Sequence, residues 1–350
     1  MTAIARPEAE RVLIVSDAWL PQVNGVVRTL SMTADELRRL GHTVEVIGPD
    51  RFRTIPCPTY PEIRLSLLPA RRLARMIESF MPCCLHIATE GPLGSAARRW
   101  ALRTGHDFTT AFHTRFPDYL RARTFVPTRL TYAWLRRFHA RSSGLMVATP
   151  SLRAELAARG FTNVRAWSRG VDLSVFQPEP REAWPDLSRP IFLYVGRVAV
   201  EKNIRAFLDL DLPGSKVVVG GGPQLAALQR DYPGVTFTGP RFGAELARAY
   251  AGGDVFVFPS RTDTFGLVLL EALACGTPVA AYKVTGPIDI ITDPAIGATD
   301  DDLRAACLRA LSADRDACRV HAERFSWASA AQSFLANLVP FEDQNVAASA

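Results

Sequence analysis

Two short stretches combine charged side chains with small residues that let a polar ligand approach the backbone. The first, residues 196–203 (GRVAVEKN), follows an apolar run and precedes a helical pattern. We therefore expect Arg197 and Lys202 at the carboxyl end of a strand, beside the N–H groups of a helix N-terminus. A planar arginine and a compact lysine suit a diphosphate, which carries about two negative charges. A solvated arginine and lysine on an ordinary loop is the alternative.

The second stretch, residues 259–271, carries two carboxylates eight positions apart. Asp263 lies in a loop, and Glu271 lies on the helix that Gly266 begins. The loop can offer a carboxylate and backbone N–H groups to a polyhydroxylated ligand, and the helix carboxylate can bind two vicinal hydroxyls, as a ribose requires. A metal-binding pair is the rival interpretation, which the lack of a nearby histidine disfavours. A helix dipole would account for Asp263 but not for Glu271.

Two residues of the N-terminal half are candidates for the same chemistry. Gly25, within residues 21–29 (PQVNGVVRT), precedes a helical pattern and can admit a phosphate oxygen or a hydroxyl close to the backbone. His113 ends a strand-like run and is expected to point into a cleft, although a hydrogen-bonded core histidine is the commoner case. Residues 220–223 (GGGP) do not complete G-x-G-x-x-G, because Leu225 occupies the third glycine position. This disfavours a dinucleotide-dependent dehydrogenase.

Alternating strand-like and helix-like segments must position these residues. Apolar runs predict buried parallel strands at 11–16, 44–48, 85–88, 109–113, 144–148, 190–195, 216–219, 235–238, 254–258 and 278–281. Helical spacing predicts helices at 28–40, from 151, at 203–210, from 224, at 243–251 and at 266–274. The pattern breaks between 164 and 185. We therefore predict an α/β fold of two doubly wound, Rossmann-like domains that face each other across a cleft.

The chain length of 350 residues also suits two domains. We place the first at 1–170 and the second at 171–324, and expect a helix at about 325–340 to pack back on the first. No apolar run approaches the roughly 18 residues of a membrane-spanning helix. Residues 1–11 lack the apolar segment of a secretory signal. The six cysteines form no C-x-x-C pair, so reduced thiols are expected.

Charge is distributed unevenly along the chain. Residues 1–170 hold 25 arginines, no lysine and 13 acidic residues, a net +12, whereas residues 171–350 carry −6. An anionic partner, either membrane headgroups or nucleic acid, is one interpretation, and an arginine-rich solvated surface is the other. Two basic helical stretches with apolar faces suit an anionic membrane, although each can equally pack on a core. Their candidate membrane-binding or acceptor-binding residues are Arg71, Arg72, Arg75, Trp134, Arg136 and Arg137.

Together these segments resemble the retaining glycosyltransferases of family 4, which have the GT-B fold. The similarity is strongest to the branch of phosphatidylinositol mannosyltransferases and diacylglycerol glycosyltransferases, and it spans residues 11 to about 338. It is carried by Asn24-Gly25-Val26, Phe112-His113-Thr114, Arg169-Gly170-Val171-Asp172, Gly196-Arg197 with Lys202-Asn203, Gly220-Gly221-Gly222-Pro223 and the Asp263/Glu271 pair.

The resemblance implies a role for each position. Arg197 and Lys202 would hold the donor diphosphate beside the Gly25 amide, Glu271 would bind the ribose, and Asp263 would meet the transferred sugar. His113 would contact the sugar and turn its carbonyl toward the developing positive charge. The remaining donor contacts would come from Gly222, Arg241, Phe265, Gly266 and Leu267. The family usually has Glu at the position of Asp263, which leaves the hexose open.

The implied reaction moves a hexosyl or uronosyl group from a nucleotide sugar, a UDP-sugar being favoured, to a membrane lipid such as diacylglycerol. Retention of configuration is expected, with no cofactor and no metal. We expect a monomer or weak dimer, cytoplasmic and peripherally bound to the inner face of the membrane, without nucleic acid. Since Gly25 and His113 come from the other domain, catalysis should require closure of the cleft.

Other functions remain open at this level. A GDP-mannose-dependent mannosyltransferase and a polysaccharide enzyme with a soluble acceptor would share the fold. A nucleic-acid-binding protein would use the arginine-rich half, but the chain has no recognisable motif for it and Asp263 and Glu271 would be unexplained. A non-catalytic nucleotide-sugar sensor is a further alternative, against which the intact set of Arg197, Lys202 and Glu271 argues.

Overall fold

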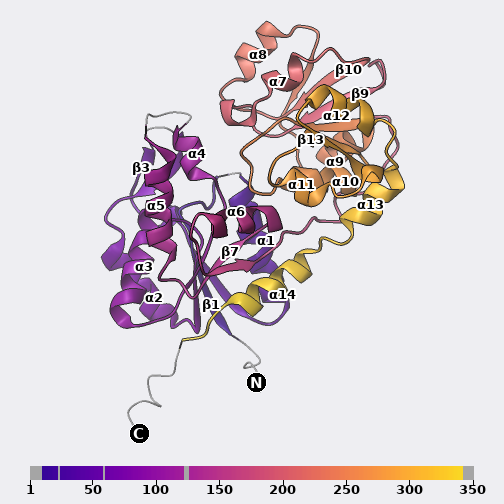
Figure 1. Ribbon diagram of the computed structural model, residues 1–350. Helices are drawn as coiled ribbons and strands as arrows, with labels where there is room; N and C mark the ends of the chain where they lie inside the picture. Colours follow the sequence, from indigo (N-terminus) through magenta and orange to yellow (C-terminus); the bar gives the residue numbers. More distant parts are fainter. Residues whose placement is uncertain (1–9, 23, 58–59, 122–125, 342–350) are drawn as a thin grey trace. The chain divides into compact units, whose positions relative to one another are not determined.

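The computed structural model describes residues 10–22, 24–57, 60–121 and 126–341 (Figure 1). The chain forms two compact units. Unit 1 takes the chain up to Ala148, residues 153–168 and the segment from Trp327 onward, and unit 2 takes residues 149–152 and 169–326. The chain thus passes from one unit to the other at 168/169, two residues before the expected boundary, and returns at 326/327.

Unit 1 is built on a six-stranded parallel sheet in the order β2-β1-β5-β6-β7-β8. Its strands are β1 (Arg11–Val15), β2 (Thr43–Ile47), β5 (Cys84–Ile87), β6 (Thr109–Ala111), β7 (Gly144–Val147) and β8 (Val164–Ala166). The four inner strands are almost wholly buried, as expected for a parallel sheet covered on both faces. The apolar runs predicted these four strands because burial on both faces removes the polar alternation of a half-exposed strand. The edge strand β8 was not predicted, since it lies where the sequence pattern was expected to break.

Helices cover this sheet, and a small hairpin lies beside it. The helices are α1 (Gly25–Arg39), α2 (Ala70–Phe80), α3 (Pro92–Thr104), α4 (Phe116–Arg121), α5 (Thr128–His139), α6 (Pro150–Ala158) and α14 (Trp327–Asn337), with the 3-10 turn η1 (Pro49–Arg51) and the hairpin β3 (Thr54–Cys57) and β4 (Tyr60–Ser66). The last helix, α14, packs on α1, and Phe334 lies 4.8 Å from the Trp167 ring between centroids. The C-terminal segment is therefore part of the core of unit 1 (Figure 1).

Unit 2 repeats the plan with the strand order β11-β10-β9-β12-β13-β14, which is the 3-2-1-4-5-6 order of dinucleotide-binding folds. Its strands are β9 (Ile191–Val195), β10 (Ser215–Val219), β11 (Thr236–Gly239), β12 (Val255–Phe258), β13 (Val279–Tyr282) and β14 (Gly297–Asp300). Its helices are α7 (Arg205–Leu208), α8 (Leu225–Asp231), α9 (Gly243–Gly252), α10 (Leu267–Ala274), α11 (Pro287–Ile290), α12 (Leu303–Ala310) and α13 (Arg315–Ala322), with the 3-10 turns η2 (Val200–Lys202) and η3 (Pro294–Ile296). The predicted doubly wound architecture is confirmed for each unit.

One predicted helix starts later and is shorter than expected, at a place that matters for the site. The segment 203–210 was expected to be a helix that starts at Asn203. Instead residues 200–202 form η2, Asn203 has a left-handed backbone (φ 54°), and α7 spans only four residues. Asparagine tolerates this conformation because its short side chain can bond locally. Lys202 therefore lies on a tight turn, and no long helix begins beside it.

The two basic helical stretches differ in what their apolar residues do. In α2, Leu73 and Ile77 are fully buried and Met76 and Phe80 pack against the same core. The apolar face of α2 is thus a core-packing face, and contact with a membrane would have to come from other side chains. In α5, Phe138 is buried, whereas Leu130 and Trp134 are 58% and 45% exposed. Across the described part of the chain, no helix is long and apolar enough to cross a bilayer.

Candidate functional site

The candidate residues of unit 2 gather at the point where the strand order of its sheet reverses. Strands β9 and β12 are neighbours there, and the loops that follow them carry residues 196–203 and 259–266. The Asn203 side chain donates to the Pro259 carbonyl at 3.1 Å, and the Thr262 hydroxyl donates to the Glu201 carbonyl at 3.4 Å. The two loops are therefore held together outside the carboxyl ends of the strands, where doubly wound sheets bind ligands.

Lys202 and Asp263 meet in this junction although they are 61 positions apart. Lys202 Nζ donates to Asp263 Oδ1 at 2.6 Å, and the two side chains are 23% and 16% exposed. The second carboxylate oxygen, Asp263 Oδ2, is buried and has no hydrogen-bond partner within the described residues. A half-satisfied carboxylate beside an ammonium is suited to accept a hydrogen bond from a ligand hydroxyl while the ammonium faces an anion.

Arg197 lies at the end of β9 and is held through its backbone. The Tyr194 hydroxyl donates to the Arg197 carbonyl at 2.8 Å, and burial raises the pKa of this tyrosine, which keeps it a donor. The Arg197 side chain is 38% exposed, and its Nε lies 3.9 Å from Glu201 Oε1. The guanidinium thus remains in contact with solvent at the same edge as Lys202, as a phosphate-binding arginine must.

Two glycines allow the ends of β9 and β10 to approach each other. Gly220 has φ 147°, and a Cβ there would lie 1.8 Å from the Gly196 carbonyl oxygen. Gly222 has φ 154°, and its Cβ would lie 2.4 Å from the Val198 carbonyl oxygen. The Val198 N–H donates to the Gly221 carbonyl at 2.8 Å. The backbone of residues 220–222 therefore packs directly against residues 196–198, and a side chain at Gly220 or Gly222 would force the two loops apart.

The helix N-terminus that this site offers belongs to α10. Gly266 precedes α10 with a left-handed backbone (φ 86°), and no side chain caps the helix within the described part of the chain. Phe265, next to it, is buried. The first N–H groups of a helix need acceptors, and an anion can supply them. Phe265, Gly266 and Leu267 thus lie at this helix N-terminus, and their contacts with a phosphate or sugar oxygen stay a prediction, whereas the helix start expected at Asn203 is absent.

Glu271 lies inside α10 and is almost fully buried, at 4% exposure. Its Oε2 accepts a hydrogen bond from the Tyr250 hydroxyl at 3.0 Å. Tyr250 is itself packed between Phe176 and Phe256, with ring centroids 6.0 Å and 5.6 Å away. The carboxylate is therefore fixed in orientation by a rigid aromatic group from α9, and a ribose would meet it in one direction.

Glu271→Gln should raise the donor KM by about 10–100-fold and change kcat less, because a hydrogen bond to a charged group contributes about 1.5–3 kcal/mol. The reason is that the amide oxygen can keep accepting from the Tyr250 hydroxyl, but an NH2 donor then replaces the second carboxylate oxygen that would accept from a ribose. Initial rates across a donor concentration series measure this. Tyr250→Phe is the matched control: it keeps the carboxylate charge, and its KM should rise less. An unchanged KM in Glu271→Gln would remove Glu271 from the donor site.

Arg241 is held by an aromatic ring at the next loop of unit 2. Its guanidinium carbon lies 4.9 Å from the centroid of the Trp184 ring. The neighbouring Phe242 is 66% exposed, which is unusual for a phenylalanine in a short loop. The sequence reasoning selected Arg241 from the resemblance but missed Phe242. A large aromatic residue four positions after the strand predicted at 235–238, and directly before Gly243, was the signal that could have drawn attention to it.

Gly25 and His113 belong to unit 1. Gly25 is the exposed first residue of α1, which Asn24 caps by accepting from the N–H groups of Val26 and Val27 at 3.0 Å each. The cap explains why α1 begins three residues before the predicted start. His113 follows β6 and sets its ring against Trp167, edge to face, with centroids 5.6 Å apart. Both lie after the carboxyl ends of strands, as expected.

The same end of the unit 1 sheet holds an apolar hollow that the sequence reasoning did not define. It is lined by Glu90, Gly91, Pro92, Ser95, Phe116, Leu130, Thr131 and Trp134. Phe116, Leu130 and Trp134 are each 45–58% exposed. Glu90 Oε1 lies 3.2 Å from Nε2 of the buried His139. One polar wall and three exposed apolar side chains make this hollow suited to an amphiphile.

Among the described residues, no three His, Cys, Asp or Glu side chains gather closely enough to hold a metal ion together. Four of the six cysteines, Cys84, Cys275, Cys307 and Cys318, are buried, and Cys57 and Cys83 are half-buried. Burial raises the pKa of the Cys307 and Cys318 thiols to about 12, so both are protonated at neutral pH.

Comparison with known proteins identifies the class of this fold and site. The family described as "Glycosyltransferase Family 4" matches residues 23–175, and "Glycosyl transferases group 1" matches residues 189–313. A GDP-mannose-dependent alpha-mannosyltransferase of Mycobacterium tuberculosis is 34% identical over 307 residues, which are 81% of each chain. This chain therefore belongs to glycosyltransferase family 4 and is a glycosyltransferase.

Further relatives act on different sugars. The sulfoquinovosyl transferase of Arabidopsis thaliana is 30% identical over 91% of this chain and 71% of its own length. The alpha-monoglucosyldiacylglycerol synthase of Streptococcus pneumoniae is 26% identical over 87% of this chain and 79% of its own length. The structure of sucrose-phosphate synthase from Thermosynechococcus elongatus superposes with a TM-score of 0.74 at 20% identity, covering 97% of this chain and all of that one. This likeness shows that the fold is GT-B.

Proposed function

We propose that this glycosyltransferase moves a hexosyl or uronosyl group from a nucleotide sugar to a membrane lipid, with retention of anomeric configuration. The observation that carries the proposal is the Lys202–Asp263 pair at the β9/β12 junction. It combines a cation for a leaving diphosphate with a carboxylate whose second oxygen has no partner within the described residues. Arg197 and the uncapped N-terminus of α10 add positive potential at the same edge.

In this proposal Arg197, Lys202 and Asp263 stabilise the charges that develop, and the reaction needs no side-chain nucleophile. As the bond between the anomeric carbon and the diphosphate oxygen breaks, negative charge grows on that oxygen, and Arg197 and Lys202 oppose it. The Asp263 carboxylate holds a sugar hydroxyl and faces the developing oxocarbenium character. The acceptor hydroxyl attacks from the same face as the leaving group, and its proton passes to the departing phosphate. One C–O bond breaks, one C–O bond forms, and the nucleoside diphosphate leaves with the proton.

A lipid acceptor is supported by the apolar hollow of unit 1. Phe116 follows His113 by three residues, and with Leu130 and Trp134 it exposes apolar surface at the carboxyl end of the sheet. An acyl or glyceryl segment would bury that surface, and Glu90 could accept a hydrogen bond from a hydroxyl. The name of the Streptococcus pneumoniae relative, a glucosyldiacylglycerol synthase, agrees with this choice.

The test is a donor panel against vesicles that contain diacylglycerol, with products identified by mass and anomeric configuration by NMR. UDP-glucose, UDP-glucuronate and UDP-galactose are the expected donors. GDP-mannose is included because the Mycobacterium tuberculosis relative is named for it. With one of these donors, the product should be a glycolipid in which the transferred sugar keeps the anomeric configuration that it had in the donor. Transfer only to water-soluble acceptors would overturn the lipid acceptor, and an inverted product would overturn retention.

A further inference from the structure

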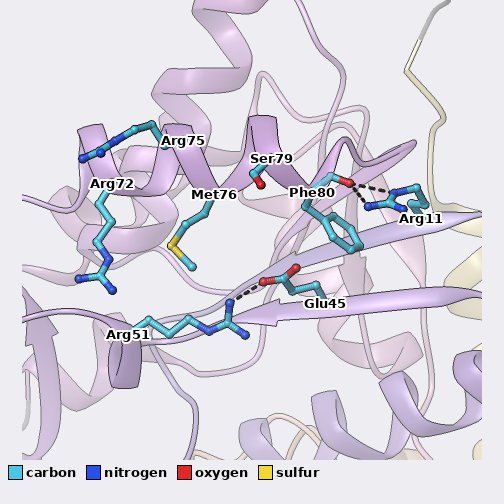
Figure 2. Close-up of a pocket in the computed structure, with 8 residues that line it drawn as sticks. All are labelled: Arg11, Glu45, Arg51, Arg72, Arg75, Met76, Ser79 and Phe80. Carbon is cyan, nitrogen blue, oxygen red and sulfur yellow. Dashed lines mark hydrogen bonds and ion pairs between the residues drawn. The ribbon is translucent and has the colours of Figure 1, made fainter.

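The apolar hollow of unit 1 has a charge that sets it apart from the rest of the unit. Of the eight described residues that line it, Glu90 alone is charged. Residues 1–170, which make up most of unit 1, have a net charge of +12, and the pocket between α2 and β2 is lined by four arginines and one glutamate (Figure 2). The hollow is therefore an acidic and apolar site in a cationic unit, and its own charge does not favour an anion.

A buried histidine fixes the Glu90 carboxylate. Glu90 lies in the loop between β5 and α3, and its Oε1 is 3.2 Å from Nε2 of His139, with the two side chains 21% and 1% exposed. On the other side of the imidazole ring, Nδ1 is 2.9 Å from the Thr110 hydroxyl, which donates to the Ser142 hydroxyl at 3.1 Å. Because Thr110 lies on the buried strand β6, the ring is tied to the sheet, and the carboxylate is held in one orientation.

A second carboxylate occupies the helix N-terminus beside Glu90. Asp17 follows β1 and is 6% exposed, and its carboxylate oxygens accept from the N–H groups of Leu93 and Gly94 at 2.8 Å and 3.2 Å. These two residues stand in the first turn of α3, whose first residue, Pro92, has no N–H. A helix N-terminus commonly binds phosphate through such donors. Here the chain's own Asp17 takes them, so this end of α3 does not serve a phosphate.

We propose that the hollow binds an uncharged lipid alcohol, such as a diglyceride. Glu90 accepts a hydrogen bond from the free hydroxyl of this lipid, and His139 is the residue that positions Glu90. The inference rests on the proposed function, because it names the kind of lipid that acts as acceptor and the residue that selects it.

The selection follows from the chemistry of the headgroup. A hydroxyl can donate to a carboxylate, whereas a phosphate diester has no donor and carries the same charge as Glu90. Like charges brought together at a binding site disfavour the wrong partner, so Glu90 rejects phospholipid headgroups. Phe116 and Leu130, which are 46% and 58% exposed, supply the apolar surface that the glyceryl and first acyl carbons would cover.

The experiment measures transfer to two lipids that are presented in the same neutral detergent micelles. Dioctanoylglycerol has a free hydroxyl and no charge, and dioctanoylphosphatidylglycerol has free hydroxyls and a phosphate. The full chain should prefer the first by at least about 100-fold in kcat/KM. Glu90→Gln should raise the KM for dioctanoylglycerol about 10-fold, as expected for the loss of a hydrogen bond to a charged group, and leave the donor KM unchanged. It should also narrow the preference, because the repulsion of the phosphate is lost.

Three further variants separate the causes. Asp35→Asn is the matched control: it removes one negative charge from an exposed position of α1 that does not line the hollow, and its acceptor KM should stay within about 2-fold of wild type. Glu90→Asp should keep the rejection of the phosphate but bind dioctanoylglycerol more weakly, because it keeps the charge and shortens the reach. His139→Gln should raise the acceptor KM and leave the donor KM unchanged, which a general loss of structure would not do.

Binding of each lipid without donor, followed by titration calorimetry, keeps this inference distinct from the proposed function. A wild-type preference for dioctanoylphosphatidylglycerol, no binding of dioctanoylglycerol, or an unchanged acceptor KM and preference in Glu90→Gln would each overturn the selection by Glu90. If dioctanoylglycerol binds and Glu90→Gln weakens that binding, while no donor of the panel yields a glycolipid, the lipid site stands and the proposed function fails.

Discussion

Lys202→Ala is expected to lower turnover by about 10²–10³ while the protein stays folded. The estimate follows from the cost of removing one preorganised donor to a developing oxyanion, about 3–4 kcal/mol. The variant also leaves the Asp263 carboxylate, 16% exposed, without the ammonium that it contacts at 2.6 Å. Single-turnover rates at saturating donor measure the effect, and circular dichroism with thermal unfolding checks the fold.

The control for this prediction is Lys283→Ala, an exposed lysine after β13 of the same unit. It removes the same charge and should retain wild-type turnover. If Lys202 acts on the leaving group and also orients Asp263, the double variant Lys202→Ala/Asp263→Asn should lose less than the two single losses combined, because contacting residues couple. A Lys202→Ala protein with near wild-type turnover would be incompatible with the proposed site.

Gly220→Ala is expected to destabilise unit 2 by about 3 kcal/mol, because the new Cβ would meet the Gly196 carbonyl oxygen at 1.8 Å in a backbone conformation that alanine rarely adopts. For a unit of this size the loss corresponds to an unfolding temperature lower by about 6–12 °C. Differential scanning calorimetry of the full chain measures it. The donor affinity should fall as well, since the loops after β9 and β10 must separate.

Gly234→Ala provides the comparison within the same unit. A Cβ at Gly234 would meet no atom within 4 Å, so the unfolding temperature should stay within about 2 °C of wild type, as for most surface substitutions. If Gly220→Ala also unfolds at the wild-type temperature, the close backbone packing at residues 220–222 is more adaptable than its contacts indicate. That result would contradict the idea that this packing shapes the donor site.

Ten of the twelve strands described in the two parallel sheets were predictable, because buried parallel strands are short continuous apolar runs, which a sequence displays directly. The partly buried edge strands β8 and β14 were missed. The residues after β9 and β12 were therefore placed correctly at strand ends, and the resemblance to family 4 selected Arg197, Lys202, Asp263 and Glu271 among them. Their contacts were not predictable. The Lys202–Asp263 pair depends on β9 and β12 being neighbours, which follows from strand order and not from any local pattern.

Other features were hidden for similar reasons. The helical pattern at 203–210 ignored the left-handed conformation of Asn203, which separates η2 from α7. The amphipathic pattern of α2 indicated a helix but not which surface its apolar face would cover, and that face packs on the core of unit 1. The pocket drawn in Figure 2 joins residues from β1, β2, η1 and α2, so this grouping depends on the fold of unit 1 and not on any local sequence pattern.

Amide hydrogen exchange of the full chain, followed by mass spectrometry with and without saturating UDP or GDP, tests the donor site most directly. The nucleoside diphosphate should slow exchange in peptides that cover residues 196–203, 220–223 and 259–271, and leave α2 unchanged. Lys202→Ala should weaken that protection. Protection confined to other segments, or none with either nucleotide at concentrations that saturate turnover, would contradict the assignment of the β9/β12 junction as the donor site.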